Sequence, residues 1–246
     1  MLYAVFYALQ AAVAIAIPIV FLAKYSKKYQ CEKSSKGNGV AVFFIFGAAA
    51  NSVISLYITG MFKPSSPFVQ NLWLSALVSA VINTVCVVLG KFIWFKFVMK
   101  EANSKHDAVM FGGGYATWFM VMSYAISAIV SVVFALLNVF AKDTQISEIL
   151  RDTYEIYASS SYYQIFLVTI QCVLLGASEL FTSITLFGAT KKQTSPLFFV
   201  AGTLLSFGIY FTPFTPLSLE INLIILAVIT LLTSYTAYIT YKKAVH

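Results

Sequence analysis

The sequence predicts an all-α fold: a polytopic bundle of about seven membrane-spanning helices, forming a single transmembrane domain over residues 1–246. Hydrophobic residues make up 60% of the chain, charged residues only 10%, and the mean hydropathy is +0.84. Soluble domains are usually about 45–50% apolar and about 25% charged. Seven apolar runs each reach the roughly 20 residues that a helix needs to cross the hydrocarbon core. Together these observations predict an integral membrane protein.

The first three runs, residues 2–23, 39–62 and 72–97, are predicted to be the first three spans. Polar connections separate them, and the connection after the first run is rich in lysine. Lysines also lie at the end of the third run. Because lysine favours the cytoplasmic face, both of these ends are predicted to lie on that side.

The fourth run, residues 108–141, is about 34 residues long and exceeds one crossing even with tilt. It contains the consecutive glycines Gly112, Gly113 and Gly114. Each glycine weakens a helix by about 1 kcal/mol, although small residues also let neighbouring helices approach. We therefore expect a helix break or a close helix contact at these glycines, followed by a regular helix from about Tyr115.

Residues 162–187, 197–217 and 221–241 are the last three predicted spans. Pro213 and Pro216 predict a turn at the outer end of the sixth span. The longest stretch outside the runs, residues 142–161, is predicted to be an extracytoplasmic acidic loop or interfacial helix. Its acidic residues are Asp143, Glu148, Asp152 and Glu155.

The distribution of basic residues predicts the orientation. Thirteen of the 16 Lys and Arg residues follow alternate runs, which places them on one side of the membrane. Only Lys63, Lys142 and Arg151 fall on the other side. The N-terminus is therefore predicted outside and the C-terminus inside, with the chain in a bacterial cytoplasmic membrane. The net charge of +7 indicates contact with membrane lipid, namely an anionic inner leaflet. Outside the predicted spans, no basic run carries the interleaved aromatics that would indicate a nucleic-acid partner.

Few ionisable residues lie within the predicted spans. Glu179 in the fifth span is a functional candidate because a charge in lipid is costly. It is expected to face the bundle interior or a water-filled cavity, or to be protonated. Lys91 and Lys96, near the cytoplasmic end of the third span, are expected to reach the interface by snorkelling. The uncharged polar residues of the spans are expected to join helices; they are Asn51, Asn83, Gln171 and Asn222.

The residues that catalysis needs are scarce. The two histidines, His106 and His246, both lie outside the predicted spans. A zinc hydrolase needs about three protein ligands, and no HExxH motif or Walker A loop occurs. The sequence therefore predicts no catalytic residue, no metal ligand and no cofactor.

Two motifs nevertheless carry a family resemblance. Residues 90–100, GKFIWFKFVMK, look like a Gly-Arg-aromatic-Ile-x-aromatic-Lys motif, with Lys91 in place of arginine. Residues 112–119, GGGYATWF, look like a Gly-x-Gly-His-Gly motif that is followed by a glutamate. With these motifs the chain resembles the YhfC-type intramembrane metalloproteases, relatives of the CAAX-protease and PrsW-type membrane enzymes. The resemblance covers most of the chain, from the first span to the sixth.

The resemblance also implies that the family's catalytic side chains have been replaced. A Glu-Glu pair would stand at Val87 and Val88, the histidine at Tyr115 and the glutamate at Phe119. A later histidine maps to Glu179, and a final histidine motif maps to about Gly202–Ser206. In such enzymes these groups hold a metal and activate water, which Val, Tyr and Phe cannot do. The implied degenerate cavity is lined by Val87, Val88, Lys91, Tyr115, Phe119, Glu179, Gly202 and Ser206.

Three functions stay open. The resemblance favours a non-catalytic, pseudoprotease-like scaffold that binds a lipid, a peptide or a partner membrane protein, such as a transporter subunit, in an accessory, sensing or immunity role. The alternative is a small transporter or substrate-capture component in which Glu179 takes up a proton or cation. The third is an intramembrane protease that is still active through an unusual site.

Overall fold

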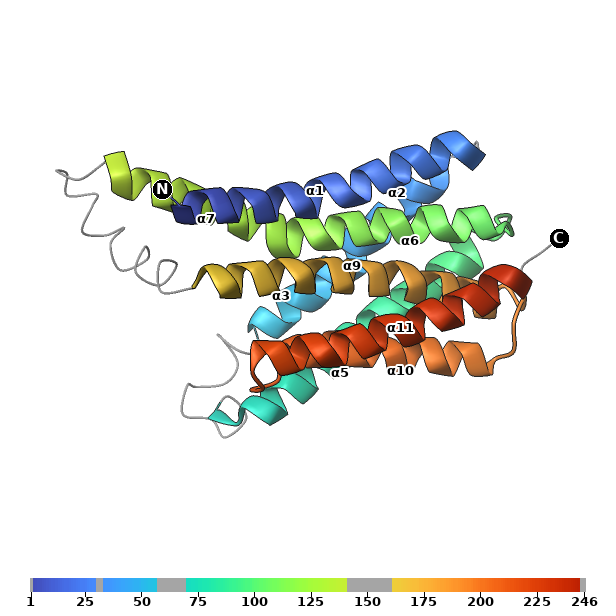
Figure 1. The fold of residues 1–246 in the computed structure, drawn as a ribbon. Helices are drawn as coiled ribbons and strands as arrows, with labels where there is room; N and C mark the ends of the chain where they lie inside the picture. The colour runs from blue at the N-terminus through green and yellow to red at the C-terminus, as the bar shows by residue number, and fades with distance from the viewer. Residues whose placement is uncertain (1, 30–32, 57–69, 141–160, 244–246) are drawn as a thin grey trace.

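The computed structural model describes residues 2–29, 33–56, 70–140 and 161–243. These residues are almost entirely helical and contain no strand (Figure 1). Seven helices among them are long and apolar enough to cross a membrane, which confirms the predicted all-α bundle. The ends marked N and C lie at opposite ends of the bundle in Figure 1. Which end faces the cytoplasm stays a prediction.

Several spans combine an α-helix with a short π-helical or 3-10 segment. The elements are α1 Leu2–Tyr29; α2 Lys33–Val42, η1 Phe43–Gly47 and α3 Ala48–Leu56; α5 Leu72–Ile93 and η3 Trp94–Val98; α6 Lys105–Met120, η4 Val121–Ala125 and α7 Ile126–Phe140; α9 Tyr162–Thr190; α10 Leu197–Phe211 and η5 Thr212–Phe214; α11 Leu219–Lys243.

The predicted spans agree with these helices except at their ends. Helix α1 continues to Tyr29, six residues beyond the predicted end at 23, because Lys24, Lys27 and Lys28 stay helical after the apolar run ends. Basic side chains in a last helical turn interact favourably with the free carbonyls there. The predicted acidic loop or interfacial helix at 142–161 lies outside the described residues, apart from Ser161. Ser161 caps α9 through a capping box with Gln164.

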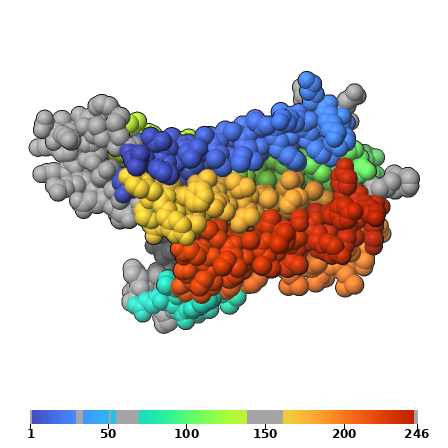
Figure 2. Space-filling model, viewed as in Figure 1, coloured from blue at the N-terminus to red at the C-terminus, as the bar shows by residue number. Residues whose placement is uncertain are grey.

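Helix α9 is the centre of the bundle and contacts α1, α5, α6, α10 and α11. In Figure 2 it lies between α1 and α11 across the visible face. Its buried positions include small and polar residues as well as large apolar ones, and Ser178, Glu179, Thr182 and Ser183 are all completely buried. The hydroxyls of Thr182 and Ser183 donate to carbonyls one turn earlier, so the helix itself satisfies these polar groups.

The predicted helix break at Gly112, Gly113 and Gly114 is wrong, because α6 runs through all three glycines as a regular α-helix. The second part of that expectation, a close helix contact, is present. A Cβ on Gly114 would overlap the backbone carbonyl of Lys36 in α2, and one on Gly112 would lie 2.9 Å from the carbonyl oxygen of Leu180 in α9. Close packing therefore offsets the low helix propensity of glycine. The fourth span changes from α-helix to π-helix in η4, which begins at Val121, seven residues after Gly114.

Candidate functional site

A buried ion pair joins α5 to α9. The Nζ atom of Lys91 lies 2.7 Å from Oε2 of Glu179, and both side chains are 0% exposed. Lys91 therefore does not snorkel to the interface, and that prediction is wrong: its ammonium lies inside the bundle, against α9. Glu179 likewise faces the interior. Each charge would be costly to bury alone, and their attraction offsets part of the cost of removing both from water.

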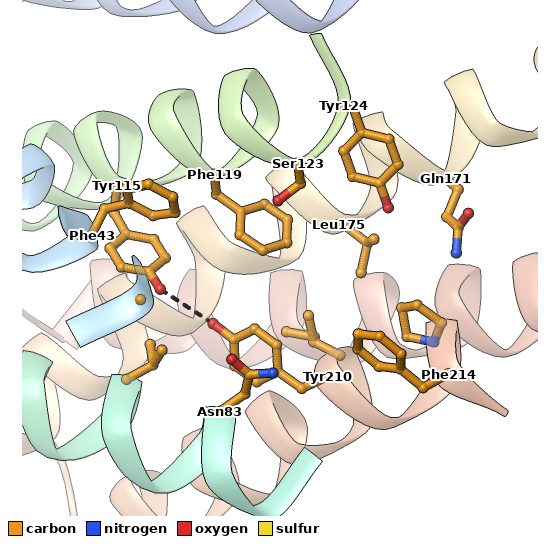
Figure 3. A pocket seen from close by; sticks show the side chains of 14 residues that line it. Phe43, Asn83, Tyr115, Phe119, Ser123, Tyr124, Gln171, Leu175, Tyr210 and Phe214 are labelled. Atoms are coloured by element: carbon orange, nitrogen blue, oxygen red, sulfur yellow. Dashed lines mark hydrogen bonds between the residues drawn. The ribbon is translucent and has the colours of Figure 1, made fainter. Parts of the chain in front are cut away.

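Two tyrosines extend the pair to α6 and α10. Nζ of Lys91 lies 4.2 Å from the centroid of the Tyr115 ring, a cation–π arrangement. The Tyr115 hydroxyl lies 3.3 Å from the Tyr210 hydroxyl, and both side chains are buried (Figure 3). We call Lys91, Tyr115, Glu179 and Tyr210 the polar cluster. It takes one residue from each of four helices and so fixes their relative positions.

A cavity of about 320 Å³ adjoins the polar cluster, and Tyr115 and Tyr210 belong to both. In Figure 3, Phe43 and Tyr115 mark one end of this central cavity, and Gln171 and Phe214 the other. Most of its wall is aromatic or aliphatic, but two amide side chains, Asn83 and Gln171, also line it. Both are buried. The cavity therefore offers apolar surface together with hydrogen-bonding groups of both kinds.

The structure brings together five of the eight residues predicted for the degenerate cavity. Val87, Tyr115 and Phe119 line the central cavity, and Lys91 and Glu179 form the ion pair beside it. Positions from α5, α6 and α9 that are far apart in the sequence therefore meet at one place.

The other three predicted residues are buried but are not among the described lining residues of the central cavity. Val88 packs in the hydrophobic core. Gly202 lies against α9, where a Cβ would come within 3.0 Å of the Leu186 side chain. Ser206 is 1% exposed, and its hydroxyl has no hydrogen-bond partner among the residues described. These three residues therefore belong to helix packing around the site.

Sequence reasoning missed the cavity roles of Asn83, Gln171 and Tyr210. The two amides were expected to join helices, and their presence in apolar spans was the signal that marked them. Tyr210 had no such signal, since the chain contains 15 tyrosines and 22 phenylalanines. The Asn222 Oδ1 accepts from the Thr215 hydroxyl at 2.8 Å, which links the start of α11 to the turn before it and not to another helix. The Asn51 side chain lies outside the described part of the structure.

A membrane-spanning helical bundle with a polar cluster and a cavity between its helices defines an integral membrane protein with a buried site. The model of the YhfC intramembrane metalloprotease family matches residues 13–210, so the chain belongs to this family. It is also 21% identical over 131 residues to the uncharacterized membrane protein YhfC of Bacillus subtilis (strain 168). That match covers 53% of this chain and 51% of the relative, so the chain spans about half the length of the curated relative. No solved structure matches the chain.

The family name implies a metal, and the residues of the polar cluster do not fit one. Glu179 is the cluster's one carboxylate, and the Lys91 ammonium donates to it at 2.7 Å. A metal cation at this carboxylate would be repelled by the ammonium. The remaining side chains of the polar cluster are phenols, whereas zinc sites in proteins use carboxylate, imidazole and thiolate. In the described ranges, no group of three or more His, Cys, Asp or Glu residues could hold a metal ion.

Proposed function

We propose that this protein is a non-catalytic, pseudoprotease-like member of its family that binds an extended peptide segment in the central cavity. The observation that carries the proposal is the Lys91–Glu179 pair at 2.7 Å, next to a cavity lined by Val87, Tyr115 and Phe119. The resemblance places family glutamates at Val87 and Phe119, histidines at Tyr115 and Glu179, and an arginine at Lys91.

Peptide hydrolysis needs an activated nucleophile. In the polar cluster, the carboxylate that could act as a base is paired with an ammonium, and its neighbours are buried phenols. Val87 and Phe119 can neither bind a metal nor accept a proton. A peptide bond in the cavity would therefore meet apolar and hydrogen-bonding groups but no group suited to activate water.

The chemistry of the cavity favours a peptide over a lipid chain. A backbone segment inside a membrane must find partners for its N–H and C=O groups. Asn83 and Gln171 each offer a donor and an acceptor, which matches both groups. Aromatic walls such as Phe43, Phe119 and Phe214 suit apolar peptide side chains. A saturated acyl chain would leave both buried amides without a matching group.

This binding would serve an accessory, sensing or immunity role, in which a captured peptide or a segment of a partner membrane protein is held without being cut. Transport through Glu179 is the alternative. The ion pair counts against it, because the carboxylate is already neutralised by Lys91. Loss of uptake in Glu179→Gln, with the protein still folded, would favour transport.

The test uses the full chain in lipid nanodiscs and a library of ten-residue apolar peptides that carry a photoreactive group. We expect crosslinking to the wild type and a loss of at least fivefold in Asn83→Leu and in Gln171→Leu. Asn103→Leu is the matched control, because Asn103 is an exposed amide on the turn before α6. A photoreactive palmitoyl probe that labels the cavity while the peptides do not would assign the cavity to lipid and overturn the proposal.

Metal analysis and a cleavage assay test the non-catalytic part. We expect the protein, purified without chelator and loaded with zinc, to retain less than about one tenth of an equivalent of metal and to leave the bound peptides uncut. Stoichiometric zinc together with cleavage would show an active protease.

A further inference from the structure

A second hollow, of about 740 Å³, lies at the end of the bundle where α9 ends and α10 begins. It shares no lining residue with the central cavity. Its wall contains four lysines, two from η3 and the turn that follows it and two from the end of α9. We call this hollow the lysine groove and define it by Lys96, Lys100, Lys191, Lys192, Phe92 and Phe199.

Three of the four lysines present their charge to the surroundings. Lys96, Lys100 and Lys192 are exposed. Neither Lys96 nor Lys192 has a carboxylate within ion-pair distance in the described part of the chain, and Lys100 is 3.8 Å from the exposed Glu101. Nζ of Lys96 lies over the Phe92 ring, 5.4 Å from its centroid, which holds the ammonium at the groove without neutralising it.

The fourth lysine has a structural partner. Nζ of Lys191 donates to the backbone carbonyls of Met99 and Lys100, so it binds the end of η3 to the end of α9. Burial lowers the pKa of Lys191 from its ordinary value. The contact with these two carbonyls gives Lys191 a structural role. The ammonium groups of Lys96, Lys100 and Lys192 donate to no backbone carbonyl in the described part of the chain, so their charges stay available at the groove.

The backbone also places Lys192 at the groove in an uncommon conformation. Lys192 has φ of 58°, in the left-handed region, at the position after the C-cap of α9. Its N–H donates to the Ala189 carbonyl, and that of Gln193 to the Gly188 carbonyl, so the end of α9 is a Schellman motif. Glycine is preferred at this position, and lysine is disfavoured there. A lysine here brings its charge to the groove despite this conformational cost.

Apart from Thr190, the rest of the wall is apolar. Phe92 and Phe199 pack edge to face, with ring centroids 5.6 Å apart. Val200 also lines the groove and is 54% exposed, and the neighbouring Leu197 is 74% exposed. Exposed apolar residues on a membrane-spanning helix indicate contact with acyl chains. The groove thus joins a cluster of cations to an apolar surface at one membrane face.

We propose that the lysine groove binds an anionic phospholipid. The headgroup phosphate pairs with Lys96, Lys100 and Lys192, and an acyl chain lies over Phe92, Phe199 and Val200. Basic pockets between helices at a membrane face are suited to anionic headgroups, and each nearby lysine adds to the attraction. A free phosphate would satisfy the lysines but would leave the apolar wall uncovered.

The test uses the 246-residue chain in phosphatidylcholine nanodiscs doped with dioleoylphosphatidylglycerol, with retained lipid measured by native mass spectrometry. We expect the wild type to retain phosphatidylglycerol at least tenfold over phosphatidylcholine. The variant Lys96→Gln/Lys100→Gln/Lys192→Gln should lose at least tenfold of this preference. The matched control, Lys27→Gln/Lys28→Gln/Lys242→Gln, removes three exposed lysines outside the groove and should lose less than twofold.

An equal loss of the phosphatidylglycerol preference in the two triple variants would show that the preference arises from general surface charge. That result would overturn the proposal. Competition with inorganic phosphate and with sn-glycerol 3-phosphate needs only the wild type, so it holds even if a variant does not fold. Displacement of the lipid by either anion at millimolar concentration would assign the groove to a free anion and would equally overturn the proposal. No displacement supports the lipid.

Discussion

The Lys91 ammonium lies against the face of the Tyr115 ring, 4.2 Å from its centroid, while it donates a hydrogen bond to Glu179. Three helices, α5, α6 and α9, therefore share one buried charge pair. Tyr115 stands where the resemblance places a family histidine. In this chain the ring at that position faces the ammonium of Lys91.

Glu179→Gln should leave the buried Lys91 without its counter-charge and lower the free energy of unfolding by about 3–5 kcal/mol, as expected for breaking a buried ion pair. Lys91→Met should cost a similar amount. The double variant Lys91→Met/Glu179→Gln should be more stable than either single variant, because it leaves no buried charge. Thermal unfolding in detergent measures this, with the exposed Lys242→Met as control. A double variant whose loss equals the sum of the single losses would contradict the pairing.

Gly114→Ala should destabilise the bundle severely, because its Cβ would overlap the Lys36 carbonyl and separate α2 from α6. Gly37→Ala is the matched control, since nothing lies within 4 Å of a Cβ there. It should raise stability by up to about 1 kcal/mol through helix propensity. Melting temperatures of the two variants test the helix contact, and equal shifts would argue against it.

Tyr210→Phe should cost about 1–3 kcal/mol, because the buried Tyr115 hydroxyl would lose its partner 3.3 Å away. Tyr115→Phe should cost about as much while keeping the ring that faces Lys91. The double variant Tyr115→Phe/Tyr210→Phe should recover most of the loss, since it removes both hydroxyls. A double-mutant cycle of unfolding free energies measures the coupling, and additive losses would show that the two hydroxyls act independently.

The predicted orientation can be tested with fusions at the C-terminus. A green fluorescent protein fusion should fluoresce, and an alkaline phosphatase fusion should be inactive, because the lysine-rich face is predicted to be cytoplasmic. The reverse result would place Lys191, Lys192 and the lysine groove on the outer side. The groove would then face a different leaflet.

The positions of the spans follow from the sequence because hydropathy is a local property. The lysines that follow an apolar run can stay helical, so the ends of helices such as α1 differ from the predicted ends of the runs. The buried position of Lys91 could not be predicted in this way. The expectation of snorkelling rests on the distance of a lysine from its helix end and takes no account of a partner on a neighbouring helix. Its partner lies 88 residues away in the sequence.

Helix propensity is also a local property, and it fails in the same way at the glycines of α6. Propensity predicts a break at Gly112–Gly114, but packing against Lys36 and Leu180 keeps the helix continuous. The resemblance indicated five positions that meet at the site, because motifs record which residues lie near each other in the fold. It could not indicate Asn83 or Gln171, since neither belongs to either of the two motifs.

The pairing of α5 with α9 affects the order in which the spans can be buried during membrane insertion. Lys91 leaves the ribosome 88 residues before Glu179. At roughly 5–20 residues per second, that is an interval of roughly 4–18 seconds. Throughout that interval Lys91 has no buried partner, and its ammonium must stay in contact with water or lipid headgroups. A chain truncated before residue 179 should therefore be retained by insertion factors or degraded, even though four complete spans have already been synthesised.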